Sequence, residues 1–431
     1  MTNWKMTIGI ECHVQLATTT KLFSPADNDA RGKEPNSVVH PIDYGLPGML
    51  PVLNKEAVNL AIKAGKALNA KIANLSRFDR KHYFYPDLPS GYQITQMYHP
   101  TILAGLVETP LEDGSSVKVR IHHAHIESDA GKLSHYGSYS LVDLNRAGTP
   151  LIEIVSEPDM HSPQEAKAFA AELHKLMTYA GVTYGDLFNG NMRFDVNLSV
   201  AADDATELGK RAEVKNLNSF RSVERAAEYE FRRQVELLEK GERVVQETRG
   251  WDDATGRTSS QRSKEDAQDY RYMPDADIPP VTLTDEYIAE VQATVPELPP
   301  YYRQKFAQLG LDKSVVGSIL HRQSYAALIA TIQDNAGDDK AKRVANWFAS
   351  SISTDEETAE IASVFTPEGF IELAEMVDKN ELSSTAAKEV FNELLSSDKT
   401  PRQIAEEKNL LQMSDEGAIA TIVDTVLADP A

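Results

Sequence analysis

Alternation of apolar and polar residues is the strongest pattern in the first 200 or so residues of the chain. Successive side chains of a strand point to opposite faces, so this alternation predicts strands with one buried face and one polar face. The segment MTIGIECHVQL (residues 6–16) places Cys12 among isoleucines on one face, and Glu11 and His13 on the other. One face therefore resembles core and the other resembles a site.

Three later segments repeat this pattern. LIEIVSEPD (residues 151–159) places Glu153 and Glu157 opposite the isoleucines. In VKVRIHHAHIESDAGK the polar positions are His123, His125, Glu127 and Asp129, which are expected on the same face as Val119 and Ile121. In NMRFDVNLSV they are Arg193, Asp195, Asn197 and Ser199. A solvated face of an antiparallel sheet is the alternative interpretation for any one of these strands.

Helical periodicity appears between these strands and dominates later in the chain. Two Pro-Pro pairs within residues 276–303 interrupt both helices and strands, and we place the main boundary near residue 293. The helical runs are 54–70, 162–181 and 220–240 before this boundary, and 340–352, 368–379 and 384–396 after it. The pattern predicts an α+β region followed by a helical domain.

The composition and net charge of the chain limit the classes of function that it can have. The chain has 431 residues and a formal net charge of −21, which argues against non-specific adhesion to nucleic acid. It lacks a long apolar run and begins without a secretory signal, so we expect a cytoplasmic protein that does not enter the membrane. The single cysteine excludes an internal disulfide and an all-cysteine zinc site, and we interpret Cys12 as a core residue.

The polar faces are rich in Glu, Asp and His, the residue types that bind divalent cations. Glu153 and Glu157 are about 13 Å apart along a strand, too far to share one ion. Neighbouring strands lie about 4.8 Å apart, so Glu11, His13, Glu127 and Glu153 converge if their strands are adjacent. An acidic face of this kind suits Mg²⁺ bridging to phosphate.

Neither a phosphate-binding glycine loop nor a dinucleotide-binding glycine motif occurs in the sequence. Any ATP must then be held by a cation and dispersed side chains. Arg193 and Lys215 are candidate phosphate partners, and each is equally consistent with a surface ion pair. A zinc hydrolase built on His123 and His125 is a rival, although no zinc-protease motif supports it.

The segment FDRKHYFYPDLPSGYQITQ (residues 78–96) mixes basic and aromatic residues in a loop punctuated by Pro and Gly. Such a mixture can stack a base or a terminal nucleotide. It is equally consistent with a loop that is held by its own aromatic side chains.

Taken together, these segments resemble one family, the B subunit of the aspartyl/glutamyl-tRNA amidotransferase. The resemblance covers nearly the whole chain. The motifs, in order, are IGIECHVQL, GLPGMLPVLN, FDRKHYFYPDLPSGYQITQ, HIESDAGK, VDLNRAGTPLIEIVSEPD, NMRFDVNLSV, EVKNLNSF and SKEDAQDYRYMPDADIPP.

The resemblance implies a glutamine-synthetase-like antiparallel-sheet cradle domain over residues 1–293 and an all-α helical domain over residues 294–405. It also implies that residues 406–431 begin a helical tail domain that binds tRNA, and the chain is expected to stop inside it. The implied chemistry is transfer of the γ-phosphoryl group of ATP to the side-chain carboxylate of Glu-tRNA(Gln) or Asp-tRNA(Asn), followed by amidation with ammonia.

The resemblance also implies roles for particular residues. Glu11, His13, Glu127 and Glu153 are expected to hold Mg²⁺, and Asp195 joins the three glutamates as catalytic. The expected substrate- and nucleotide-binding residues are Lys81, Tyr83, Tyr85, Arg193 and Lys215.

Ammonia is expected from a partner amidase subunit, with a small third subunit bridging the two, because the chain has no amidase signature of its own. Many relatives carry four cysteines before GLPG as a zinc site; this segment has none here, so no zinc is expected. Two further departures are Ser128 and Ser90, where an acid and a lysine are usual. The rival within this family is a non-catalytic scaffold that only binds tRNA.

Overall fold

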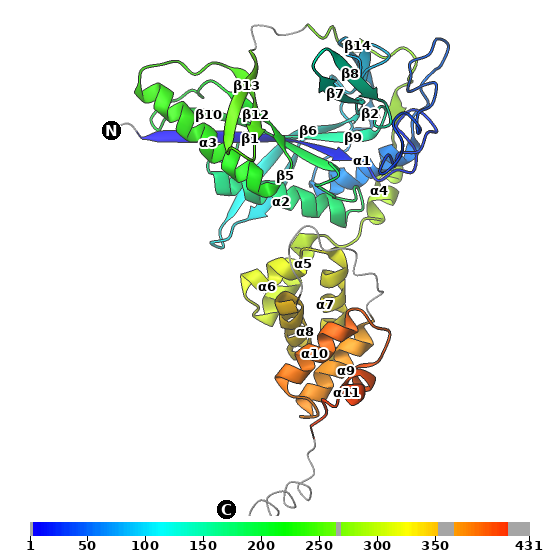
Figure 1. Ribbon diagram of the computed structural model, residues 1–431, viewed down its shortest axis with the longest axis vertical. Helices are drawn as coiled ribbons and strands as arrows, with labels where there is room; N and C mark the ends of the chain where they lie inside the picture. The colour runs from blue at the N-terminus through cyan, green and yellow to red at the C-terminus, as the bar shows by residue number, and fades with distance from the viewer. Residues whose placement is uncertain (1–2, 264–268, 352–365, 413–431) are drawn as a thin grey trace, which may run out of the picture. The chain divides into compact units, whose positions relative to one another are not determined.

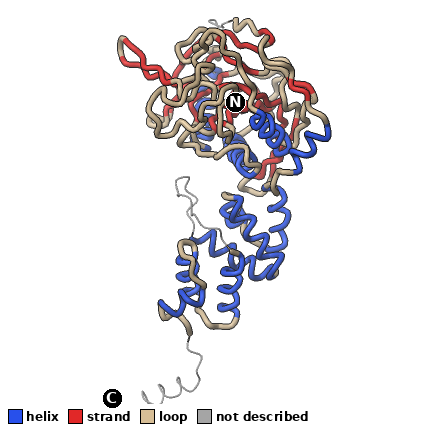
Figure 2. The backbone as a smooth tube through the Cα atoms, turned by 90° about the vertical axis from the view of Figure 1, so that its right-hand side faces the viewer, coloured by secondary structure: helices blue, strands red, loops and turns tan. Residues whose placement is uncertain are grey.

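The computed structural model describes residues 3–263, 269–351 and 366–412 and divides the chain into two compact units, 1–298 and 299–431. The first unit combines strands and helices, and the second is helical within the described residues (Figures 1 and 2). The expected α+β region and the helical region that follows it are both present. Most of the expected tail segment, residues 413–431, lies outside the described residues.

An eight-stranded sheet forms the centre of the first unit, in the order β13-β12-β11-β10-β1-β9-β6-β5. All neighbouring pairs are antiparallel except β11 and β12, which run parallel. The bounds of its strands are β1 Trp4–Gln15, β5 Gly105–Pro110, β6 Ser116–Ser128, β9 Pro150–Ser156, β10 Met192–Ala202, β11 Ala212–Leu217, β12 Glu247–Asp252 and β13 Arg257–Ser263.

Three smaller sheets accompany it, in the orders β14-β3-β4, β15-β2 and β7-β8. Figure 1 shows several of these strands on the side of the central sheet opposite α2 and α3. Their bounds are β2 Leu75–Ser76, β3 Asp79–His82, β4 Tyr92–Thr95, β7 Lys132–Tyr136, β8 Tyr139–Asp143, β14 Met273–Pro274 and β15 Val281–Thr282.

Helices cover the apolar face of the central sheet. The isoleucines of β1 and Cys12 are almost fully buried in the same core as residues of α1 (Lys55–Ala67), α2 (Pro163–Tyr179) and α3 (Phe220–Glu239). Side-chain caps fix where these helices begin: Asn54 accepts from the Glu56 amide, Ser162 from the Glu165 amide and Ser219 from the Ser222 amide. The polar face is thereby left for a site.

A bulge in β6 changes which residues share a face. The register between β6 and β9 shifts between Ile121 and His123. As a result Val119 and Ile121 are buried in the core, whereas His123 and His125 lie on the polar face. The sequence-based placement of Val119 with these histidines was wrong, because a bulge inserts one residue and reverses the alternation.

α4 (Asp285–Ala293) closes the first unit by packing on α1, where the Tyr287 hydroxyl donates to Asn59 Oδ1 at 2.6 Å. The Pro-rich segment then leads into the second unit, which begins at Pro299. The change of unit falls between Leu298 and Pro299, slightly beyond the position near 293 that the sequence suggested.

The second unit is a set of short helices around aromatic side chains. Phe348 packs against Phe370 and Phe391, with ring centroids 5.5 and 5.0 Å away. The elements are α5 Pro299–Phe306, η2 Ala307–Leu309, α6 Lys313–Ile319, α7 Gln323–Ala336, α8 Asp338–Ser351, α9 Pro367–Asp378, α10 Ser384–Leu394 and α11 Pro401–Glu407. In the described part of the chain, no helix has the length and apolar character needed to cross a bilayer.

A buried ion-pair network fastens α3 to the edge of the central sheet. The Glu230 side chain is fully buried, and its Oε2 accepts from Arg233 Nε at 2.9 Å and lies 3.5 Å from Arg249 Nε. Both arginines are largely buried, so removing Glu230 takes the closest counterion from Arg233 and leaves Arg249, among the described residues, with Glu247 alone.

We therefore expect Glu230→Ala to lower the free energy of unfolding by roughly 3–5 kcal/mol. Glu228→Ala, on the same helix, removes an exposed ion pair with Arg232 and is expected to cost less than about 1 kcal/mol. Urea denaturation followed by circular dichroism measures both. Equal, small effects would show that the network contributes little.

Candidate functional site

Strand register brings the polar residues of four strands together. β1 lies between β10 and β9, and β6 follows β9, so the strands identified from the sequence are neighbours. His13 is directly opposite Glu153 on β9 and opposite Arg193 on β10. His125 of β6 is opposite Glu153 from the other side.

The first cluster consists of His13, Glu127, Glu153 and His125. His13 Nε2 lies 3.5 Å from Glu153 Oε2 and 3.9 Å from Glu127 Oε1. His125 Nε2 lies 3.5 Å from a carboxylate oxygen of each of the same two glutamates. Glu127 is only 4% exposed, so its carboxylate has little contact with water.

Electrostatic interactions in the first cluster favour the charged forms of both His13 and Glu153. Burial disfavours a charged imidazole, but the hydrogen bond to Glu153 and the charges of Glu153 and Glu127 raise the pKa of His13 to about 9. Burial likewise acts to raise the pKa of Glu153, and His13, His125 and Lys81 outweigh it and hold that pKa well below its usual range. The site thus attracts positive charge.

The second cluster consists of Glu11, Asp195 and Glu213, with one carboxylate oxygen from each lying within 4.8 Å of the others. Lys215 Nζ joins it, 2.7 Å from Asp195 Oδ2 and 2.9 Å from Glu213 Oε1. Burial and the charges of Glu153 and Glu213 raise the pKa of Glu11. Asp195 and Glu213 raise the pKa of Lys215 against the effect of burial.

Glu11 was expected with His13, Glu127 and Glu153, and it lies instead in the second cluster. The register explains this difference: Glu11 faces Val155 and Asp195, whereas His13, two residues further on, faces Glu153 and Arg193. A carboxylate oxygen of Glu11 consequently lies with those of Asp195 and Glu213, and Glu11 is not in the group of ligand atoms formed by His13, Glu127 and Glu153.

Glu213 was not identified from the sequence, although it is two residues from Lys215 in the same alternating segment. The signal was present in EVKNLNS, where positions 213 and 215 share a face. What the sequence could not show is that β11 pairs with β10, which brings Glu213 beside Asp195 and Glu11.

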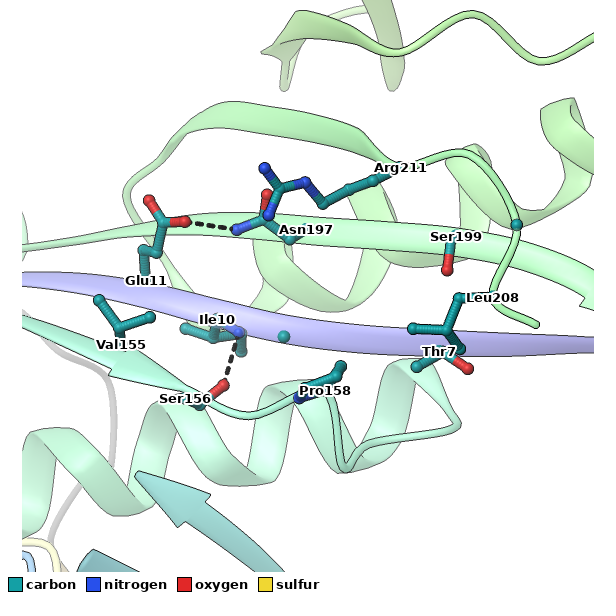
Figure 3. A pocket seen from close by; sticks show the side chains of 12 residues that line it. Thr7, Ile10, Glu11, Val155, Ser156, Pro158, Asn197, Ser199, Leu208 and Arg211 are labelled. Carbon is teal, nitrogen blue, oxygen red and sulfur yellow. Dashed lines mark hydrogen bonds between the residues drawn. The ribbon is translucent and has the colours of Figure 1, made fainter. Parts of the chain in front are cut away.

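A small cavity opens beside the second cluster (Figure 3). Its volume is about 200 Å³, and Glu11, Asn197, Ser199, Thr7, Leu208 and Arg211 are among the residues that line it. Asn197 Nδ2 donates to Glu11 Oε1 at 2.8 Å, and the guanidinium of Arg211 lies across Asn197 (Figure 3). The buried Oδ1 of Asn197 has no hydrogen-bond partner among the described residues.

Lys81 faces the first cluster from the short sheet β14-β3-β4. Burial lowers its pKa, and Glu127, Glu153 and neighbouring tyrosines raise it more. Tyr83 follows in the chain, and its pKa is raised by burial and by nearby carboxylates including Glu127. Tyr85 is more than half exposed and lines an open pocket with Phe84.

Arg193 borders the first cluster and forms an ion pair, with its Nη2 3.0 Å from Asp129 Oδ2. Arg146 Nε approaches the same carboxylate at 3.5 Å. Neither Arg193 nor Lys215 is therefore an isolated surface cation, because each is tied into the acidic face.

The histidine pair proposed for zinc lacks a third ligand among the described residues. His123 Nε2 lies 3.2 Å from His125 Nδ1 with the rings stacked, and burial together with both neighbouring histidines lowers the pKa of His123 to about 4. Neither of the two ligand groups that the described residues form includes His123.

Both clusters fit a divalent cation that prefers oxygen ligands. The first combines two carboxylates with one imidazole at a single point, and the second combines three carboxylates beside an unsatisfied amide oxygen. Mg²⁺ binds through few carboxylates and keeps water in its remaining positions, which matches these donor sets.

Comparison with known proteins gives the class of the protein. Residues 6–289 match the GatB/GatE catalytic domain, and residues 329–431 match the GatB domain. Three similar proteins are each named as the B subunit of an aspartyl/glutamyl-tRNA(Asn/Gln) amidotransferase. The chain is 45% identical to that of Persephonella marina, 45% to that of Thermotoga maritima and 46% to that of Halorhodospira halophila. The matches cover 97–99% of this chain and 89–90% of the relatives.

The mixed sheet with two acidic clusters is thus the catalytic domain of one component of a ligase-class tRNA amidotransferase. The chain belongs to the family of the B subunit of the aspartyl/glutamyl-tRNA(Asn/Gln) amidotransferase. The family that the sequence motifs indicated is confirmed.

If the first cluster binds a divalent cation, Glu127→Gln should weaken Mn²⁺ or Mg²⁺ binding at least ~10-fold, because it removes one anionic ligand. Isothermal titration calorimetry measures this directly. Glu108→Gln, at an exposed position of β5, is the matched control and should bind like the wild type.

Unchanged cation binding in Glu127→Gln would contradict the assignment of the first cluster. Stoichiometric zinc in the purified protein, lost on replacing His123, would instead favour the zinc alternative.

Proposed function

We propose that this chain uses ATP to phosphorylate the side-chain carboxylate of Glu-tRNA(Gln) or Asp-tRNA(Asn), and that ammonia then converts the product to the amide. The names of the similar proteins, which specify tRNA(Asn/Gln) amidotransferases, support the substrates. The single observation that supports this chemistry is the pair of acidic clusters on one face of the central sheet, each with a lysine beside it.

The reaction has two steps. A carboxylate oxygen of the substrate forms a bond to the γ-phosphorus while the bond to ADP breaks. The ammonia nitrogen then attacks the acyl carbon, phosphate leaves, and the nitrogen loses one proton. Both steps require groups that hold anions and reactants in line at fixed positions.

Attack of a carboxylate on a phosphoryl group is opposed by repulsion between the two anions. We propose that His13, Glu127 and Glu153 hold one Mg²⁺, and that Glu11, Asp195 and Glu213 hold a second. When bound, Mg²⁺ supplies the positive charge that reduces this repulsion. Glu11, predicted with the first ligand set, thus remains a catalytic candidate at the second.

The cationic side chains are assigned by their positions. Lys81 is half-buried and its charge interacts with those of Glu127 and Glu153, so we propose that it neutralises the substrate carboxylate or the transferring phosphoryl group. Lys215, held by Asp195 and Glu213, contacts phosphate at the second cluster. Arg193, fixed by Asp129, borders the first cluster. The cavity beside Glu11 holds part of the nucleotide, with Arg211 available for its phosphates.

The large, mostly antiparallel sheet with one polar face supports the expected likeness to the glutamine synthetase cradle. The remaining parts of the reaction come from partners. We propose an amidase subunit as the source of ammonia and a small subunit that bridges the two, because the similar proteins are named as one lettered component of a larger enzyme.

A non-catalytic tRNA-binding scaffold is the alternative function. It does not account for the burial of Glu127 and Asp195, since side chains that only align or repel an RNA strand need to be exposed. Buried carboxylates gathered at two points suit chemistry more than surface docking.

The test uses the complex reconstituted with its amidase and bridging subunits. Glu153→Gln should lower ATP hydrolysis dependent on Glu-tRNA(Gln) by about 100-fold or more, because it removes a charge from the proposed cation site. Glutamine hydrolysis by the partner should remain. Glu157→Gln, one residue beyond the end of the same strand and outside both clusters, is the matched control and should be close to wild type.

Full-rate, tRNA-dependent ATP hydrolysis in Glu153→Gln would refute the catalytic assignment and favour the scaffold. Activity of this chain alone on glutamine would contradict the division of labour between subunits.

A further inference from the structure

Four tyrosines form a continuous row beside Lys81. The Tyr83 and Tyr270 ring centroids lie 5.9 Å apart, those of Tyr270 and Tyr272 6.0 Å, and those of Tyr272 and Tyr98 6.5 Å. Each pair is nearly perpendicular, with interplanar angles of 65–75°. We call Tyr83, Tyr270, Tyr272 and Tyr98 the tyrosine row.

Three separate segments supply the tyrosine row. Tyr83 follows β3, Tyr98 follows β4, and Tyr270 with Tyr272 precede β14, so the small sheet β14-β3-β4 gathers them. Sequence reasoning identified only Tyr83 among them, because the pairing of β14 with β3 joins positions almost 200 residues apart.

The row is not an ordinary part of the core. Tyr98 is 58% exposed, and the other three are half-buried. Tyrosine hydroxyls that are packed away usually find a hydrogen-bond partner. Within the part of the chain that the structure describes, none of these four hydroxyls has one, so they add nothing to the fold through hydrogen bonding.

The backbone between Tyr270 and Tyr272 is held in an unusual conformation. Arg271 has φ +42°, in the left-handed region that a long side chain seldom adopts. His82 fixes it from β3: its amide donates to the Tyr270 carbonyl at 2.8 Å, and its Nδ1 lies 3.0 Å from the Arg271 carbonyl. Such strain is retained where the surrounding structure enforces it, commonly at binding sites.

The tyrosine row adjoins the first cluster through Lys81. Lys81 Nζ lies 5.0 Å from the Tyr270 ring centroid and 5.9 Å from that of Tyr83, and its charge interacts with Glu127 and Glu153. Aromatic faces, a cation and a carboxylate-lined reaction site therefore follow one another over a short path. A ligand with a flat base, a phosphate and an attached reactive group fits this order.

We propose that the tyrosine row stacks the 3′-terminal adenine of the charged tRNA and so positions its aminoacyl group at the first cluster. This rests on the proposed function. Single-stranded ends of RNA are recognised by stacking of unpaired bases on aromatic side chains. The end of a macromolecule has to enter its binding site from solvent, which an enclosed pocket does not allow. The tyrosine row is open in this sense, because Tyr98 and, nearby in the chain, Met97 and Phe84 are exposed.

The adenine of ATP is the other base present in the reaction. The cavity beside Glu11 is enclosed between β1, β9 and β10 and lined by Arg211 at the second cluster, which favours the nucleotide there. The first cluster and the tyrosine row then receive the second substrate.

The test measures binding and kinetics in the reconstituted complex with Tyr270→Leu and Tyr272→Leu. The probes are uncharged tRNA(Gln) and the same tRNA lacking its terminal adenosine, with binding followed by fluorescence anisotropy. In the wild type, loss of the terminal adenosine should weaken binding roughly 5- to 100-fold. In each variant, intact tRNA should bind as weakly as the shortened one, and shortening should have little further effect.

Three controls separate stacking from folding. Tyr272→Phe retains the ring, and because the hydroxyl has no partner among the described residues it should restore wild-type binding. Tyr184→Leu, a strongly exposed tyrosine elsewhere in the first unit, should bind both probes like the wild type. Thermal denaturation checks that each variant is folded.

Kinetics distinguishes the two adenines. The proposal expects a raised KM for Glu-tRNA(Gln) and an unchanged KM for ATP. If only the KM for ATP is raised, the tyrosine row binds the nucleotide. If tRNA binding by both Leu variants still depends on the terminal adenosine, the tyrosine row has a purely structural role. Either result overturns the proposal. Because the binding arm does not depend on catalysis, failure of the proposed function would appear instead as a wild-type complex without tRNA-dependent ATP hydrolysis.

Discussion

Mutual repulsion among the carboxylates on one face of the central sheet is the constraint on which the structure of the site depends. Five of them, Glu11, Glu127, Glu153, Asp195 and Glu213, lie in two groups on four strands and their neighbour β11. Like charges at such distances in a partly buried environment raise the energy of the folded state unless cations accompany them. The protein supplies these cations itself: His13, His125 and Lys81 at one group, and Lys215 at the other.

The helical layer makes this concentration of charge possible. β1 is buried almost completely on the face that meets α1, α2 and α3, so its position and register are fixed by apolar packing. A one-residue slip would turn every polar side chain of β1 into the core, at a cost far above that of the repulsion. The apolar face therefore holds the acidic face together.

Residues in alternating strands were predictable from the sequence, whereas their grouping was not. Each strand shows which side chains share its polar face, and this sufficed for Glu11, His13, Glu153 and Asp195. Grouping depends on register, a long-range property, and this is why Glu11 was not expected beside Asp195 and Glu213, and why Glu213 was missed. The β6 bulge has no clear local signal, so Val119 was misplaced as well.

Loops were harder for the same reason: Lys81 and Tyr83 were found in a basic and aromatic segment, but Tyr270 and Tyr272 reach the site only because β14 pairs with β3.

The separation of the two clusters supports their joint use in one reaction. Glu11 and His13 belong to different clusters and are two residues apart on β1, so their Cα atoms are separated by roughly 6–7 Å along the strand. A phosphoryl group in transfer lies between an attacking and a leaving oxygen, and groups on both sides must contact it at once. Because both clusters are built on the same strand, this separation is set by the backbone geometry of β1 and not by flexible loops. A rigid strand shared by two carboxylate clusters is thus the feature that suits this face to phosphoryl transfer more than to simple tRNA binding.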